Sequence, residues 1–136
     1  MLINDTPPSV RRIETDRDDA YACQVTGHIT ASDIENMYGL LEGAYELHDK
    51  IDIIVIMHDY EGIDWAAAWK EQTMLGKTQA LKHIRKYAVV GGPGWVKAMM
   101  AMFRPFFSMA MNYFELEDVD SAWEWIGARP LPEPNT

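Results

Sequence analysis

One apolar run stands out in the sequence: Ile51-Asp52-Ile53-Ile54-Val55-Ile56-Met57. Its β-branched side chains favour an extended backbone, and seven residues are too few for most helices. A strand with one face in water would alternate apolar and polar residues, whereas this run is apolar almost throughout. We therefore predict a central strand that is covered on both faces, with Asp52 at its mouth.

Two short strands and a helix are expected before this run. Residues 9–15 and 21–26 have the composition of strands, and the polar turn 16–19 between them favours an antiparallel hairpin. Thr30 and Asp33 are spaced as a capping box, in which the threonine oxygen accepts a backbone hydrogen bond and the acid reaches back. A helix is therefore expected to begin at Thr30.

Helices and strands are expected to alternate along the rest of the chain. After a loop at 58–62, a helix is expected at 65–81, capped by Asp64, and then a strand at 87–90. A helix at 95–103, ended by Pro105, precedes a buried strand at 109–114. The last helix is expected at 119–126, capped by Asp118. Such alternation is typical of an α/β domain, here a mixed sheet of about five strands with about four helices, in the order ββαβαβαβα. We expect a single domain with a core at about 9–127 and terminal extensions at 1–8 and 128–136.

The composition limits the classes of function. A net charge of −9 argues against nucleic-acid binding, which depends on cations that neutralise phosphates. Cys23 is the only cysteine, so an internal disulfide is excluded, and the first residues lack the apolar core of a secretory signal. The sequence has no recognisable motif for catalysis, a metal or a cofactor. We therefore expect a non-enzymatic cytoplasmic protein without a cofactor.

The chain resembles the SpoIIAA-like proteins, relatives of the STAS domain, from about Ser9 to Ile126. The resemblance is carried by the run 51–57, the loop 59–62, Trp65, Trp69, residues 85–91, and Trp95 with the apolar segment that follows it to Phe114. It implies a STAS-type fold, which is similar to the lipid-carrying CRAL-TRIO (Sec14-type) domains, whose mobile apolar helix gates a hydrophobic pocket.

The phosphorylation switch of STAS regulators is not expected here. In those proteins the strand that corresponds to 51–57 is followed by an Asp-Ser-Ser or similar motif, whose serine a partner kinase phosphorylates. In this chain no serine or threonine follows Asp59 until Thr73.

The segment from Trp95 to Phe114 is more apolar than one packed helix face requires. It holds all four phenylalanines and five of the nine methionines of the chain. The longer stretch between Gln72 and Glu115 contains six basic residues and no acid. An ordinary surface helix needs an apolar stripe of roughly 100°, and the apolar arc of residues 95–107 is much wider. Three outcomes can account for this excess: deeper burial of the helix under the C-terminal tail, a dimer interface, or a mobile cover over a hydrophobic ligand.

The leading hypothesis is that a small hydrophobic or lipid-like ligand binds between the sheet and the helix that begins at Trp95, with reversible docking on the inner membrane face. The candidate lining residues are Trp65, Trp69, Met99, Met102, Phe103, Phe106 and Phe107. Lys97 and Arg104 are the candidate contacts for lipid head groups.

Other interpretations remain open at this level. The same apolar surface can be a homodimer or partner interface of a STAS-like regulatory module. Gly91, Gly92 and Gly94 precede a helix, where backbone N–H groups can bind an anion; the plainer interpretation is a tight turn that lets the backbone pass close to a neighbour. A third hypothesis is an enzyme that uses His58, Asp59 and Glu61; the plainer interpretation is a solvated loop.

Overall fold

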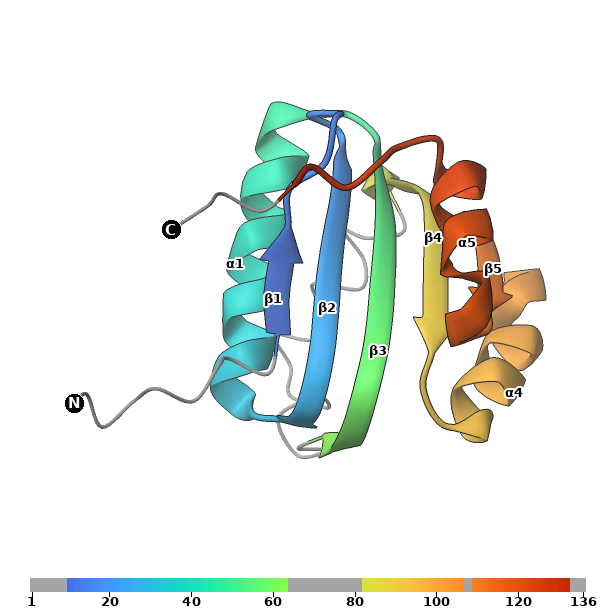
Figure 1. The fold of residues 1–136 in the computed structure, drawn as a ribbon. Helices are drawn as coiled ribbons and strands as arrows, with labels where there is room; N and C mark the ends of the chain where they lie inside the picture. Colours follow the sequence, from blue (N-terminus) through green and yellow to red (C-terminus); the bar gives the residue numbers. More distant parts are fainter. Residues whose placement is uncertain (1–9, 64–81, 107–108, 133–136) are drawn as a thin grey trace.

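The computed structural model describes residues 10–63, 82–106 and 109–132. Five strands form one sheet in the order β1-β2-β3-β4-β5 (Figure 1). The strands are β1 (Val10–Ile13), β2 (Ala20–Ile29), β3 (Ile51–Ile63), β4 (Ile84–Gly91) and β5 (Ala110–Phe114). β1 runs antiparallel to β2, and every other neighbouring pair is parallel. The predicted α/β class and mixed sheet are confirmed, and the run 51–57 lies in the central strand.

Three helices are seen in the described part of the chain, and they cover both faces of the sheet. α1 (Ala31–Leu47) and α4 (Gly94–Phe103) pack on one face, and α5 (Val119–Ile126) packs on the other. Because β2-α1-β3 and β4-α4-β5 both connect parallel strands in the same direction across the sheet, their helices are expected on one side. The fourth predicted helix, at 65–81, lies outside the described residues.

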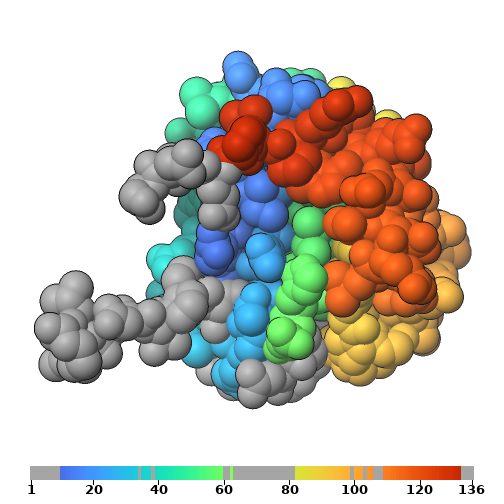
Figure 2. All heavy atoms as spheres, viewed as in Figure 1, coloured from blue at the N-terminus to red at the C-terminus, as the bar shows by residue number. Residues whose placement is uncertain are grey.

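The two faces of the sheet are packed differently. On the α5 face the core combines small side chains, among them Ala22, Ala88 and Ala122, with larger ones such as Ile54 and Trp123. On the α1 face it contains larger side chains, among them Ile53 and Val55. α5 and the segment after it cover only part of their face, so β2 and β3 reach the molecular surface beside them (Figure 2).

The start of α1 is confirmed in detail. Thr30 Oγ1 accepts from the backbone N–H of Asp33, and the Asp33 carboxylate accepts from the backbone N–H of Thr30, which completes the capping box. Asp118, the predicted cap of α5, makes no such side-chain hydrogen bond. The short 3-10 helix η2 (Leu116–Asp118) already places Asp118 near helical geometry, whereas a capping residue needs an extended backbone.

Three other predictions need correction. Residues 58–62 form no loop: β3 continues through them because β2 is also long and pairs with it as far as Ile63. The pairing is irregular there, with register shifts on either side of Gly27. β5 is half-exposed and not buried, because it is the last strand in the sheet order. Asp52 lies at the start of β3, as predicted, but its side chain is buried and not open to solvent.

Candidate functional site

The inward side of α4 fills the space against the sheet. Val96 and Met100 are each 4% exposed and form a small core with Val89 of β4. Met57, Tyr87, Met111 and Tyr113 pack around this core. At these positions α4 therefore lies directly on the sheet.

The outward side of α4 is apolar along one flank. Trp95 is 42% exposed and Met102 is 65% exposed. One helical turn is 3.6 residues, so these two side chains lie close in angle around the helix, with the exposed Ala98 and Ala101 next to them. Part of the apolar arc predicted from the sequence is thus exposed, at Trp95 and Met102.

The other outward flank of α4 is cationic. The Lys97 side chain is 66% exposed; its Nζ lies 3.9 Å from a carboxylate oxygen of Glu115 and 5.7 Å from the centre of the Tyr113 ring. Burial, and then the charge of Glu115, raise the pKa of Tyr113. Arg104 is exposed where α4 passes into the 3-10 helix η1 (Arg104–Phe106). Both predicted head-group contacts therefore face outward.

Most of the predicted ligand lining cannot be placed. Trp65, Trp69 and Phe107 lie outside the described residues, as do the side chains of Met99, Phe103 and Phe106. Met102, the remaining member, points away from the sheet. The hydrophobic pocket therefore stays a prediction.

The turn before α4 brings the backbone very close to β3. Gly91 and Gly92 have φ angles of 77° and 88°, which side-chain-bearing residues rarely adopt. A Cβ on Gly91 would lie 2.7 Å from the carbonyl oxygen of Met57, and one on Gly92 would lie 2.6 Å from its Sδ. Gly94 has open space around it. The close approach explains the first two glycines, and anion binding here stays a prediction.

The carboxyl end of β3 carries the residues of the third hypothesis. His58 and Asp59 are both exposed, and Asp59 has a φ of 48°, in the left-handed region. The side chain of Glu61 lies outside the described residues. Across the described ranges, no group of three or more His, Cys, Asp or Glu side chains could hold a metal.

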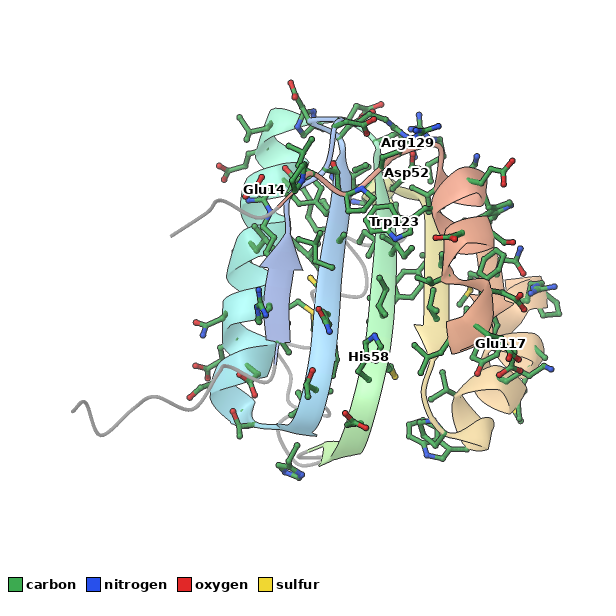
Figure 3. All side chains as sticks on the ribbon, viewed as in Figure 1. Glu14, Asp52, His58, Glu117, Trp123 and Arg129 are labelled. Atoms are coloured by element: carbon green, nitrogen blue, oxygen red, sulfur yellow. The ribbon has the colours of Figure 1, made fainter. Side chains whose placement is uncertain are left out.

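Sequence reasoning missed a charged network at the opposite end of β3, where Figure 3 shows Asp52 far from His58. Among the described residues, Asp52 is the one buried charged side chain, at 1% exposure. Its Oδ2 accepts from Nη2 of Arg17 at 2.9 Å and from Nη2 of Arg85 at 2.7 Å. Arg17 also binds Asp19, with 3.0 Å between Nε and Oδ1. The one sequence signal was an acid inside an apolar run.

Arg17, together with Lys86, also binds the end of α5. Arg17 Nη1 donates to the carbonyl oxygen of Ile126 at 3.0 Å, and Lys86 Nζ donates to that of Trp125 at 3.0 Å. A helix ends with unpaired carbonyls and partial negative charge, which cations stabilise. This network therefore joins the turn before β2 to β3, β4 and α5. Its position at the amino ends of the parallel strands indicates a structural role, because ligands of open α/β sheets bind at the carboxyl ends.

The lone thiol is not exposed for chemistry. Cys23 is buried, and burial raises the pKa of its thiol.

Within the described segments, no helix has both the length and the apolar character needed to cross a membrane.

Comparison with known proteins supports the fold. A family model described as SpoIIAA-like matches residues 21–127. The sequence matches no curated protein. Four chains of solved structures match. One is an uncharacterized protein of the DUF3478 family with a SpoIIAA-like fold from Shewanella loihica PV-4, with a TM-score of 0.69 and 23% identity over 92% of this chain and 99% of that one.

Proposed function

Because the chain belongs to the SpoIIAA-like family, we propose that it is a STAS-like binding module that docks reversibly on anionic membranes through the outer face of α4 and binds a hydrophobic ligand beneath this helix. The observation that supports docking is the exposure of Met102 and Trp95 on a helix whose inward positions are already filled by Val96 and Met100. Neither side chain belongs to the core cluster that Val96 and Met100 form with β4.

The arrangement around α4 suits a membrane surface. A fully buried methionine or phenylalanine contributes about 1.5–3 kcal/mol, and a half-exposed side chain proportionately less. A lysine or arginine near an anionic surface adds about 1 kcal/mol, which Lys97 and Arg104 can supply. The net charge of −9 opposes the approach of the whole molecule, but salt screens it beyond about 8 Å. Binding is therefore expected to be weak, oriented and reversible.

Flotation with vesicles tests the docking. Wild-type protein should float with vesicles that contain phosphatidylglycerol and less with pure phosphatidylcholine. Met102→Glu should abolish flotation, and Lys97→Glu should weaken it. Leu47→Glu is the matched control, because Leu47 is 76% exposed on α1 and should tolerate the charge. Equal flotation of wild type and Met102→Glu would reject docking through α4.

The hydrophobic ligand needs a separate test. A ligand beneath α4 must displace the contacts of Val96 and Met100 with the sheet, and methionine side chains adapt readily to such changes. Mass spectrometry of lipid extracts from natively purified protein should find a bound lipid in stoichiometric amount. If extracts contain none, the ligand part of the proposal fails and the docking part stands on flotation alone.

The alternative is a protein-interaction module that uses the same face for a second copy. It predicts a stable dimer by light scattering that Met102→Glu dissociates, with no flotation. Membrane docking predicts a monomer in solution whose flotation Met102→Glu removes.

A further inference from the structure

The methionines of this protein differ widely in their access to solvent. Met100, on the inward side of α4, is 4% exposed, whereas Met102 on the same helix is 65% exposed. The other methionine side chains that the structure describes are half-buried: Met37, Met57, Met109 and Met111. Within this described set, a reagent dissolved in water is therefore expected to reach the Met102 sulfur first.

Met102 supplies much of the apolar surface on the outward flank of α4. Trp95 lies seven residues earlier, which is about two helical turns, so the two side chains lie along one side of the helix. Among the described side chains of α4, these two are the large apolar groups that are exposed, and Met102 is the more exposed. A chemical change at Met102 therefore alters a main part of this flank.

The thioether of methionine reacts with peroxide to form a sulfoxide. A sulfur lone pair bonds to one oxygen of hydrogen peroxide and the O–O bond breaks. The departing hydroxide takes the proton of the sulfur-bound hydroxyl and leaves as water. The sulfur thus loses two electrons, which the peroxide gains. The product carries a polar S–O bond where the side chain was apolar.

We propose that Met102 is a site of reversible oxidation by peroxide, and that its sulfoxide releases the protein from anionic membranes. This switch rests on the docking proposed above, because it acts on a side chain of the docking face. Oxidation replaces a group that favours the bilayer surface with one that favours water, so docking should weaken roughly fivefold or more. Methionine sulfoxide reductases reverse the step: a dithiol is oxidised to a disulfide, and the sulfoxide oxygen leaves as water.

Docking and oxidation should oppose each other. The sulfoxide weakens docking, and a docked Met102 is shielded from peroxide by the lipid. Phosphatidylglycerol vesicles should therefore slow the oxidation of Met102 more than phosphatidylcholine vesicles do. Met37 serves as the internal control, because it lies on α1, at the other end of the sheet from α4 (Figure 1). Its oxidation rate should be the same with either lipid.

Mass spectrometry and flotation test the switch on the full chain. The protein is treated briefly with hydrogen peroxide and desalted, and peptide mapping then locates the added oxygen. Met102 should be oxidised ahead of Met37 and Met100. The oxidised protein should float less than untreated protein with phosphatidylglycerol vesicles of saturated acyl chains, and methionine sulfoxide reductases A and B with dithiothreitol should restore its flotation.

Three variants assign the effect to one sulfur. Met102→Leu keeps an apolar side chain without a thioether, so its flotation, whatever the starting value, should not change on peroxide treatment. Met37→Leu is the matched control and should lose flotation on treatment as wild type does. Met102→Gln imitates the polarity of the sulfoxide and should float as poorly as oxidised wild type without any treatment.

The outcomes distinguish the switch from the docking on which it rests. If untreated wild type does not float, docking through α4 fails and the switch fails with it. If untreated wild type floats and protein oxidised at Met102 floats equally well, docking stands and the switch is overturned. The switch is also overturned if Met102 is oxidised no faster than Met100, or if Met102→Leu loses flotation on treatment as wild type does.

Discussion

The Arg85 guanidinium binds the Asp52 carboxylate through two hydrogen bonds: Nε donates to Oδ1 at 3.0 Å, and Nη2 donates to Oδ2 at 2.7 Å. This geometry is strong and directional. Arg17, in the turn before β2, also binds Asp52, and it donates a second hydrogen bond to the carbonyl of Ile126 at the end of α5. The acid in the central strand is thus neutralised where the starts of three strands meet the end of a helix.

Removal of this acid should destabilise the fold. Asp52→Ala leaves two guanidiniums without their shared carboxylate, which costs about 3–5 kcal/mol in fully buried pairs. Because the side chains of Arg17 and Arg85 are 27% and 47% exposed, we expect about 2–3 kcal/mol here. Urea denaturation measures the loss, with exposed Asp120→Ala as the control. A loss equal to that of the control would contradict the assigned role.

Stability should fall in acid through Asp19. The hydrogen bond from Arg17 holds the pKa of the Asp19 carboxyl below its usual value, against the opposing effect of desolvation. A carboxyl with a lowered folded-state pKa stabilises the protein above its unfolded pKa of about 3.9, and this contribution is lost as the pH falls through the folded pKa. Asp19→Asn should therefore lower the free energy of unfolding at pH 7, and its decline below about pH 4 should be shallower than in wild type. Identical pH profiles would refute this.

Two glycine substitutions should act in opposite directions. Gly91→Ala combines a φ of 77° with a Cβ 2.7 Å from a backbone oxygen, so we expect a loss of at least about 2 kcal/mol. Gly39→Ala lies in α1 with nothing within 4 Å of its Cβ, and it should stabilise by about 0.5–1 kcal/mol. Thermal unfolding of both variants checks the pair. A stable Gly91→Ala protein would show that the turn before α4 can move away from Met57.

The sequence predicted the elements whose signals are local. The central strand, the α1 capping box and the strand at 87–90 follow from composition and spacing over a few residues. Residues 58–62 were misjudged because His58, Asp59 and Gly62 are typical of loops. Pairing with β2 overrides that local tendency, and the irregular register absorbs it.

The charged network could not be predicted in the same way. Asp52 was visible as an odd residue in an apolar run, but its partners Arg17 and Arg85 are remote in sequence and follow no periodic pattern. The backbone hydrogen bond between Glu14 and Leu131 likewise joins residues that are remote in sequence. For α4 the apolar excess was predicted, and the structure adds which flank is exposed.

The most direct test of membrane docking is fluorescence quenching by vesicles of phosphatidylglycerol with brominated acyl chains. If Trp95 enters the bilayer surface, these vesicles should quench wild-type tryptophan fluorescence, and Trp95→Phe should lose most of the quenching. Trp125→Phe on α5 serves as the control and should retain it. Equal quenching of wild type and Trp95→Phe, or no quenching of wild type, would contradict docking through α4.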